Sequence, residues 1–360
     1  MNMGKTLLLL IFSMSLVACS SANSQEKLVL DSYEKDQHRT LEEIIDNLLS
    51  NKLLVPIGEV PIQKDNLMTP EVLELGKILF FDPRLSGNNE VSCQTCHDPK
   101  LGYGDGKPTF TRIDGTNGLR NSSTIINSGY YTTLFWDGRA SSLEEQALGP
   151  IQDPGEMNQP LDELVEKLQA IEGYEEIFLT AFDDGITLEN IATALAAFQR
   201  LIVVNETRFD QFLKGDRNAL SPEEIRGLDL FAGKAFCITC HHGENLSDNE
   251  YYNLGLTSDD KGRFAVTGEE RDLGRVRTPS LYGITHTAPY MRDGSIDTLE
   301  EVIEFYNRGG DDHSNKSMFM KMFMSELHLS EQEKADLLAF LEVLGGEPPM
   351  FVQPDLPGFK

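Results

Sequence analysis

Apolar residues recur at helical spacing along much of this chain. After Thr69-Pro70, for example, Leu75, Ile78 and Leu79 are spaced as on one face of an α-helix. Similar runs follow residues that suit a helix N-cap, and some have the Ser/Thr-x-x-Glu spacing of a capping box. The N-caps expected from this pattern are Thr69, Thr187, Ser221, Thr298 and Ser330. Because the alternation typical of strands is scarce, we predict an all-α fold whose last helix ends at Gly345-Gly346.

Two long segments rich in Gly, Asn and Asp interrupt these helices, at residues 102–128 and 245–278. Loops of this length are unusual in a compact domain unless something else packs them, and a large apolar prosthetic group would do so. A weak repeat accompanies the loops, because a helix rich in Leu and Phe comes shortly before each pair of cysteines, at Phe80-Phe81 and at Leu230-Phe231. We therefore predict two similar helical modules in tandem.

The composition narrows the class of protein. A chain of 360 residues with 40% apolar residues can bury a sizeable core. Its formal net charge is -27 and no run of Lys and Arg offsets it, so we expect no nucleic-acid partner. An acidic surface suits a basic electron-donor protein, although a merely well-solvated surface has the same composition.

The first residues have the pattern of an export signal. Lys5 precedes a short apolar stretch, and Leu16-Val-Ala-Cys19 resembles the lipobox of bacterial lipoproteins. The stretch is too short to cross a membrane as mature structure. We predict a signal peptide over residues 1–18, lipidation of Cys19, a tether over residues 19–54, and a protein held on the periplasmic side of a membrane by lipid alone. Ordinary signal-peptide cleavage, with Cys19 incidental, is the alternative.

Four of the five cysteines form two pairs, and a histidine directly follows each pair. Residues 93–97 read Cys-Gln-Thr-Cys-His, and residues 237–241 read Cys-Ile-Thr-Cys-His. Thiols at this spacing lie on one side of a helical turn, where they can form thioethers with the two vinyl groups of a haem while the next imidazole binds its iron. Zinc binding and disulfide formation are the alternatives. The pattern predicts two haem c groups, attached at Cys93, Cys96 and His97 and at Cys237, Cys240 and His241.

The ligand opposite each of these histidines determines what the iron can do. A six-coordinate iron transfers electrons, whereas an open one can bind hydrogen peroxide. None of the other histidines lies between His97 and His241, so we expect the first haem to be open unless the second module supplies its ligand. We expect packing or surface roles for His242, His286, His313 and His328.

Several further segments resemble the family of bacterial dihaem cytochrome c peroxidases and MauG, the latter a dihaem enzyme that matures a tryptophan-derived quinone cofactor. The segments that support this resemblance are residues 75–87, 120–121, 135–139, 145–150, 156–157, 287–290 and 305–309. The resemblance extends from about residue 55 to residue 349. It implies two cytochrome c-like domains with one haem each, which we place at residues 55–207 and 208–350, before a tail at residues 351–360.

The resemblance also implies roles for individual residues on the peroxide side. Trp136, the single tryptophan, would lie between the haems and relay electrons, since an indole can be oxidised to a radical; a core aromatic residue is the alternative. Glu156 and Gln146 would be the acid and the amide of the distal pocket, and Pro150 a neighbour that shapes it. A carboxylate within hydrogen-bond reach can move a proton between the two oxygens of peroxide.

Tyr306 is the sharpest departure from the peroxidases. They have a methionine as the second ligand of the second haem, whereas Tyr306 matches MauG-type proteins. A thioether favours ferrous iron, and a phenolate favours ferric or more highly oxidised iron, so Tyr306 suits storage of oxidising equivalents on both irons. The alternative is a thioether from the group Met318, Met320, Met322 and Met324, whose alternation we otherwise attribute to apolar packing.

Three further points rest on the resemblance. It implies a calcium ion between the haems, bound through Asn121, Thr287 and Pro289, and such oxygen ligands without a carboxylate give a weak site. The loop at residues 109–120 lacks the histidine that blocks the first haem in many of these peroxidases, which predicts a constitutively open site. Arg292 stands where a histidine is common.

These features favour a dihaem peroxidase, which would reduce hydrogen peroxide to water with electrons from a small cytochrome c or another donor, through a low-spin haem and Trp136. MauG-like oxidation of a protein or small molecule by a high-valent dihaem state is the runner-up. An electron-transfer cytochrome without peroxide chemistry and an exported scaffold without haem are rivals of other classes. Members of the family are often homodimers, although no interface is evident in the sequence.

Overall fold

The computed structural model describes residues 39–62, 68–256, 259–311, 316 and 318–358. It divides into two compact units, residues 1–47 and 48–360, and the second contains both cysteine pairs. The described residues of the first unit, 39–47, include the start of helix α2 (Leu41–Ser50). The predicted signal peptide, Cys19 and most of the tether lie outside the described residues. Within those residues, every helix is too short or too polar to cross a membrane.

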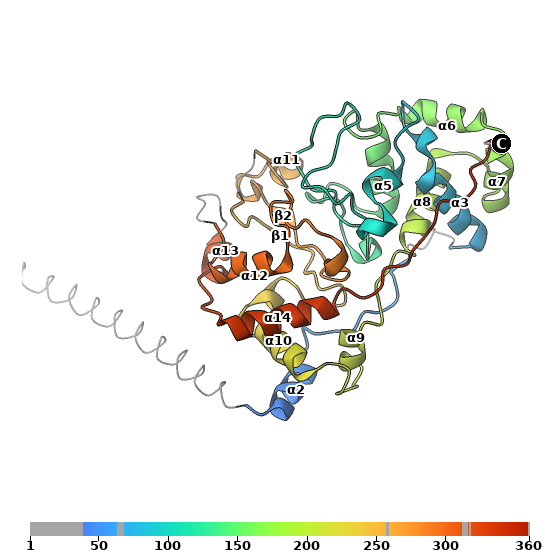
Figure 1. Ribbon diagram of the computed structural model, residues 1–360. Coiled ribbons are helices and arrows are strands. Elements are labelled where there is room, and N and C mark those ends of the chain that lie inside the picture. The colour runs from blue at the N-terminus through green and yellow to red at the C-terminus, as the bar shows by residue number, and fades with distance from the viewer. Residues whose placement is uncertain (1–38, 63–67, 257–258, 312–315, 317, 359–360) are drawn as a thin grey trace, which may run out of the picture. The chain divides into compact units, whose positions relative to one another are not determined.

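The second unit is almost entirely helical (Figure 1). Its α-helices are α3 (Pro70–Phe81), α4 (Cys93–Cys96), α5 (Leu143–Gln152), α6 (Leu161–Gln169), α7 (Tyr174–Ala181), α8 (Leu188–Gln199), α9 (Arg208–Leu213), α10 (Pro222–Ala232), α11 (Phe264–Thr267), α12 (Leu299–Asn307), α13 (Met318–Phe323) and α14 (Glu331–Val343). Its 3-10 helices are η1 (Pro83–Leu85), η2 (Pro99–Leu101), η3 (Ser128–Tyr130), η4 (Cys237–Thr239), η5 (Glu270–Asp272) and η6 (Ile284–His286). Two short strands, β1 (Tyr251–Tyr252) and β2 (Val276–Arg277), pair antiparallel. The predicted all-α class is confirmed.

The helix starts predicted from the sequence are confirmed residue by residue. Each predicted N-cap accepts a hydrogen bond from a backbone N–H in the first turn, which satisfies a donor that has no partner within the helix. These N-caps are Thr69, Thr187, Ser221, Thr298 and Ser330, before α3, α8, α10, α12 and α14. Helix α14 ends at Val343, two residues before the predicted stop at Gly345-Gly346.

A close helix crossing organises each half of the second unit. Helix α3 packs on α8, and α10 packs on α14 (Figure 1). A glycine permits each contact, because a Cβ on Gly76 would lie 1.9 Å from the carbonyl oxygen of Ala194, and one on Gly227 would lie 2.0 Å from that of Asp336. The two halves therefore have the same pair of helices, crossing in the same way, on either side of their cysteines.

The segments that lead into α5 and α12 repeat each other. Leu134 forms an isolated β-bridge with Ala140 shortly before α5, and Tyr290 forms one with Ile296 shortly before α12. Phe135, directly after Leu134, has a φ of 65°, and Met291, directly after Tyr290, has a φ of 72°. The same number of residues separates the members of every such pair. This constant spacing gives the second half a residue equivalent to each residue of this stretch in the first.

Equivalent residues also join the halves to each other. The backbone N–H of Asn121 donates to the carbonyl of Arg292 at 2.7 Å, and that of Arg277 donates to the carbonyl of Trp136 at 2.8 Å. The constant spacing relates Asn121 to Arg277 and Trp136 to Arg292. The two hydrogen bonds are thus reciprocal, as across an approximate two-fold axis. Two tandem modules of one type, predicted from the weak repeat, meet here, while their exact boundaries at residues 55, 207 and 350 stay a prediction.

The C-terminal tail reinforces this contact. After α14 the chain runs back along the first half (Figure 1), where the ring of Phe351 packs against that of Phe198 with 4.9 Å between centroids. The carbonyl of Pro349 accepts a hydrogen bond from the hydroxyl of Tyr103. Burial of these aromatic rings fixes the tail to the module that contains the first cysteine pair.

We predict that Gly76→Ala destabilises the folded protein. The new methyl group would overlap the backbone of α8 at Ala194, and overpacking of this kind costs about 2 kcal/mol or more. Chemical denaturation followed by circular dichroism measures the free energy of unfolding. Leu179→Ala on α7, where the side chain is 52% exposed, is the control and should change it little. An unchanged Gly76→Ala protein would contradict the crossing.

Candidate functional site

The second Cys-x-x-Cys-His segment forms a tight turn that directs its imidazole inward. The backbone N–H of His241 donates to the carbonyl of Cys237 at 2.9 Å. The turn is a 3-10 helix (η4), whereas the first cysteine pair lies on one turn of α-helix (α4), so the helical spacing expected for both is tightened in the second. The Nδ1 atom of His241 lies 3.1 Å from the carbonyl oxygen of Leu246, which can only accept, so Nδ1 carries the proton. The Nε2 atom is left to bind a metal.

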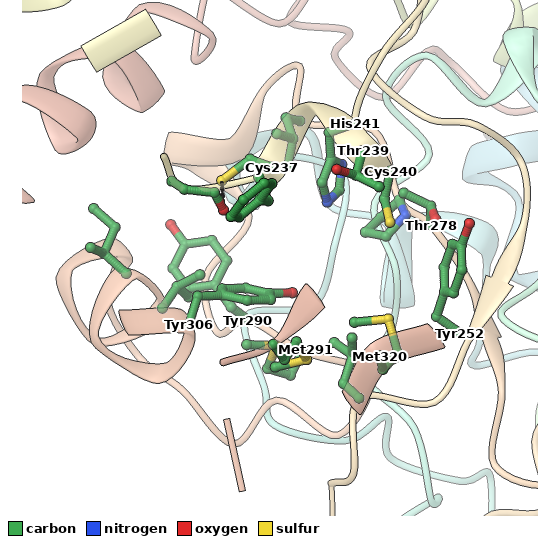
Figure 2. Close-up of a pocket in the computed structure, with 18 of the residues that line it drawn as sticks. Cys237, Thr239, Cys240, His241, Tyr252, Thr278, Tyr290, Met291, Tyr306 and Met320 are labelled. Carbon is green, nitrogen blue, oxygen red and sulfur yellow. Dashed lines mark hydrogen bonds between the residues drawn. The ribbon is translucent and has the colours of Figure 1, made fainter. Parts of the chain in front are cut away.

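A cavity of about 220 Å³ lies beneath this imidazole. His241 enters the cavity from one side, and Tyr306, Tyr290, Met291 and Met320 lie across it on the other (Figure 2). The wall is mostly apolar, and its aliphatic and aromatic members include Phe231, Leu254, Leu256, Val276, Ile303, Leu337 and Leu341. A flat apolar group bound at one imidazole, with two thiols at its edge, fits this lining.

All four described cysteines are free thiols. Burial raises the pKa of Cys93, Cys237 and Cys240 to about 12 and that of Cys96 to about 11. Protonated thiols are poor nucleophiles for disulfide exchange, so a redox disulfide is not supported. The described residues also contain no group of three His, Cys, Asp or Glu side chains suited to a metal ion such as zinc. Covalent addition to haem vinyl groups needs only that the thiols border the cavity, as Cys237 and Cys240 do.

Tyr306 lies on α12 and borders the cavity. Its ring packs edge-on against Phe305 with 5.3 Å between centroids. Burial raises the pKa of its phenol, and so does the negative charge that Cys237 and Cys240 would have as thiolates. None of the described residues forms a hydrogen bond with its oxygen, which is therefore available to a metal across the cavity from His241.

The structure also bears on the alternative in which a methionine thioether is the second ligand in place of Tyr306. Met320 and Met324 are buried and border the cavity. The side chains of Met318 and Met322 lie outside the described residues. Met291 also borders the cavity. The segment directly before it, residues 287–290, was singled out from the sequence, but Met291 itself was not.

The first Cys-x-x-Cys-His segment has the same internal geometry. The backbone N–H of His97 donates to the carbonyl of Cys93 at 2.9 Å. Its Nδ1 atom lies 3.0 Å from the carbonyl oxygen of Tyr103, which again fixes the proton on Nδ1 and leaves Nε2 free. Burial lowers the pKa of His97, as it does that of His241, so both imidazoles are held in the neutral form that binds iron.

The acid, amide and proline expected on the peroxide side gather near this turn. Gln146 and Pro150 are one helical turn apart on α5, and the backbone N–H of Met157 donates to the carbonyl of Pro150 at 3.1 Å. This bond brings Glu156 back toward α5. The negative charge of Glu156 also contributes to the raised pKa of Cys96, which places the carboxylate close to the first cysteine pair.

The electrostatics of Glu156 suit a proton carrier. Burial and the charge of Asp153 raise the pKa of its carboxyl group, against the opposing charges of Arg139 and Arg112. The loop at residues 109–120 packs beside it, since the N–H of Ile113 donates to the carbonyl of Gly155 at 3.1 Å. A carboxyl group can give a proton in its neutral form and take one in its negative form.

The constant spacing between the halves relates Pro150 to Tyr306. Both lie at the same position after the N-caps of their helices, Ser142 for α5 and Thr298 for α12. Proline has no group that can bind iron, whereas tyrosine has a phenol. The two modules therefore differ at a position that borders the cavity in the second module, and only the second has a side chain there that could bind a metal.

Trp136 belongs to the first half but borders the cavity of the second. Its indole N–H donates to the carbonyl of Asn121 at 3.0 Å, and the hydroxyl of the next residue, Ser122, donates to the carbonyl of Cys96 at 2.9 Å. A short hydrogen-bonded connection thus runs from the first cysteine pair to the wall of the second cavity. This position suits a relay between the two sites.

The residues expected to bind calcium come from loops that meet. Asn121 bonds through its backbone to Arg292, a few residues beyond Thr287 and Pro289. Its side-chain amide donates to the carbonyl of Lys107 at 2.8 Å, which leaves the amide oxygen as an acceptor. No cluster of three His, Cys, Asp or Glu side chains suited to a metal ion occurs in the described ranges, so any calcium here would depend on amide, hydroxyl and carbonyl oxygens.

The remaining described histidines form other contacts. His242 and His286 point ring nitrogens at the carbonyls of Ile238 and Gly346, both at 3.0 Å. His328 is exposed beside Glu326. None of the three borders the cavity at His241. His38 and His313 lie outside the described residues.

Comparisons with known proteins bear on both modules. Residues 70–218 match the family model described as di-haem cytochrome c peroxidase, and residues 225–345 match the model described as cytochrome c. Methylamine utilization protein MauG of Methylorubrum extorquens is 41% identical over 306 residues, covering 83% of this chain and 85% of that protein. Cytochrome-c peroxidase IdrP1 of Pseudomonas sp. (strain SCT) is 38% identical over 341 residues, covering 85% and 89%. The crystal structure of a MauG-like protein associated with microbial copper homeostasis superimposes with a TM-score of 0.72 at 35% identity, covering 82% and 94%.

The fold and the two Cys-x-x-Cys-His turns define a c-type cytochrome built from two cytochrome c-type domains. The chain belongs to the dihaem cytochrome c peroxidase and MauG family of oxidoreductases. Membership implies two haem c groups. The residues present fit them, because both proximal imidazoles have a free Nε2 and the second thiol pair borders an apolar cavity.

We predict that each cysteine pair accounts for one haem. The double variants Cys93→Ala/Cys96→Ala and Cys237→Ala/Cys240→Ala should each contain one haem per chain instead of two, measured by pyridine haemochrome absorbance. Cys19→Ser, outside both pairs, is the control and should keep two. Two haems in either double variant would show that attachment occurs elsewhere.

Proposed function

We propose that the protein reduces hydrogen peroxide at its first haem with electrons that enter at its second. The observation that supports this most directly is the difference between Pro150 and Tyr306. These residues occupy equivalent positions on α5 and α12, and only the second can bind a metal. An accessible iron suits binding of peroxide, and a six-coordinate iron suits electron transfer.

In this proposal the chain attaches the haems at the residues that the sequence indicates. Cys93 and Cys96 would form the thioethers of the first haem, and the Nε2 atom of His97 would bind its iron. Cys237, Cys240 and His241 would do the same for the second haem, whose iron Tyr306 would also bind. The haems supply the redox chemistry, and the protein supplies ligands, protons and exclusion of water.

Glu156 moves the proton that peroxide cleavage requires. Its carboxylate would take a proton from one oxygen of peroxide and return it to the other. The raised pKa of Glu156 supports this role, because the protonated carboxyl group then becomes accessible closer to neutral pH. Gln146, one turn from Pro150, orients peroxide by hydrogen bonding.

Trp136 passes electrons from the second site to the first. Its ring borders the second cavity, and its N–H contacts the segment that bonds to Cys96. The donor that we propose is a small cytochrome c or a similar protein with a basic surface, since the net charge of this chain is -27.

The N-terminal sequence and the family together suggest the cellular setting. We infer a periplasmic protein that is lipidated at Cys19 and held at a membrane through that lipid alone. A calcium ion at Asn121, Thr287 and Pro289, and a homodimer, complete the proposal; the adjacency of the two loops supports the first.

A MauG-like reaction is the second candidate, and Tyr306 favours it. A phenolate stabilises highly oxidised iron, which would let the protein oxidise another protein or a small molecule instead of accepting electrons from a cytochrome. Turnover separates the two. Rapid peroxide-dependent oxidation of a reduced cytochrome c indicates the peroxidase, whereas negligible turnover together with consumption of peroxide indicates the MauG-like reaction. An electron-transfer cytochrome would not react with peroxide at all.

We predict that Glu156→Gln slows the reaction with peroxide about a hundredfold or more, because the proton carrier is lost. Stopped-flow absorbance gives the rate constant. For the native protein it should fall at acid pH, since the carboxylate is the active base and its pKa is raised above the ordinary value of 4.5; this inflection should vanish in the variant. Glu166→Gln, on the exposed side of α6, should behave as the native protein. A threefold change or less would remove Glu156 from the mechanism.

We predict that Tyr306→Met raises the reduction potential of the second haem by about 100 mV or more, because a thioether replaces a phenolate and axial ligands set haem potentials over a wide range. Spectroelectrochemistry measures the potential. Tyr290→Phe is the matched control, since that phenol borders the same cavity but donates to the carbonyl of Ile284. Equal potentials in the native and Tyr306→Met proteins would mean that another residue is the ligand.

We predict that Trp136→Phe slows electron transfer between the sites at least about tenfold, because a phenyl ring is harder to oxidise than an indole. The measurement mixes peroxide with protein reduced only at the second haem and follows oxidation of that haem. Tyr130→Phe is the control, because it also changes an aromatic side chain of the first module but one whose hydroxyl donates to the carbonyl of Gly58 and does not border the cavity; it should leave the rate unchanged. Equal rates would exclude a relay through Trp136.

A further inference from the structure

Two buried arginines border the cavity of the second module. Arg277 is 6% exposed and Arg292 is 5% exposed, and both line the cavity. The Nε atom of each is buried without a hydrogen-bond partner among the described residues. Buried guanidinium groups are usually paired with an anion, because removing the charge from water is costly. The cavity wall thus contains two cations whose hydrogen bonds are incomplete.

Arg277 has the less compensated charge of the two. Its Nη1 donates to the carbonyl of Thr278 at 3.2 Å, and its guanidinium lies 3.3 Å from the centroid of the Tyr131 ring. The ring stabilises the cation but supplies no acceptor for Nε. Among the residues that the structure describes, no carboxylate forms an ion pair with it.

Arg292 is partly compensated. Its two terminal nitrogens donate to the carbonyls of Gly274 and Leu256. The negative charge of Asp260 acts on it, but both oxygens of that carboxylate already accept hydrogen bonds from Arg120. An additional anion in the cavity would compensate the remaining charge of Arg292.

The first module has no such charges at the equivalent positions. The constant spacing relates Arg277 to Asn121 and Arg292 to Trp136, an amide and an indole. The backbones of these four residues form the reciprocal hydrogen bonds between the halves. Positive charge has therefore been introduced at only one of two otherwise matching sites, and that is the site with Tyr306 opposite the imidazole.

We propose that Arg277 and Arg292 bind the two propionate carboxylates of the second haem and hold its reduction potential up. Each propionate supplies a counter-charge to a guanidinium group that lines the cavity and has no carboxylate of its own among the described residues. A phenolate ligand lowers the potential, and nearby cations raise it because reduction adds negative charge to the haem. The arginines thus offset Tyr306 and keep the second haem reducible by a donor. The inference rests on the second haem that family membership implies and on its proposed ligand Tyr306, but not on the peroxide reaction.

The test compares the reduction potential of the second haem in haem-loaded Arg277→Gln, Arg277→Lys and native protein, without peroxide. Arg277→Gln should lower the ferrous-to-ferric ratio at a fixed potential at least tenfold, which is a 59 mV fall for a one-electron couple. Arg277→Lys keeps the charge and should shift less. Arg308→Gln is the control, because Arg308 follows Tyr306 on the chain but is exposed and paired with Asp311; it should change the ratio by less than threefold.

Equal shifts in Arg277→Gln and Arg308→Gln would overturn the proposal. If Arg277→Gln fails to load the second haem, Arg277→Lys decides: a loaded haem with a near-native potential supports propionate pairing, and loss of haem from both means that Arg277 acts by packing on Tyr131. The proposed peroxidase fails separately, if the native protein does not react with peroxide.

Discussion

The bond from each proximal imidazole to a backbone carbonyl is the constraint on which both sites depend. Because Nδ1 of His97 and of His241 donates to the chain itself, each ring is fixed in one tautomer and one orientation, with Nε2 directed away from that carbonyl. The carbonyls come from Tyr103 and Leu246, which are fully buried, so the core of each module holds the imidazole in place. A neutral imidazole fixed in this way beside two partly buried free thiols is suited to a c-type haem.

The two modules share their architecture and differ where chemistry is decided. Matching glycines permit the same helix crossing, matching bridges lead into α5 and α12, and reciprocal backbone bonds join the halves. At one pair of equivalent positions, the first module has Pro150, which cannot bind a metal, and the second has the phenol of Tyr306. At another pair, the first module has the neutral amide of Asn121 and the second has the charged guanidinium of Arg277. A single fold used twice can thus provide one site for an oxidant and one for electrons.

The sequence predicted the features that depend on neighbours along the chain. Thr69 and Ser330 cap their helices through residues in the first turn, and the spacing of Cys93, Cys96 and His97 needs only one helical turn. Features that depend on distant contacts were not predicted. Gly76 looks like an ordinary helix residue until α8 lies against it, and Arg277 becomes notable only when it is buried without a carboxylate. The roles of Trp136, Glu156 and Tyr306 came from family resemblance, and no local pattern would have indicated them.

We propose that one haem is open and that the other has ligands on both faces. Electron paramagnetic resonance of the ferric, haem-loaded protein distinguishes the two, because an open ferric haem is high-spin and one with two strong ligands is low-spin. We expect one signal of each kind in equal amounts, with only the high-spin signal lost on addition of peroxide at short times. Two low-spin signals that do not respond to peroxide would contradict it.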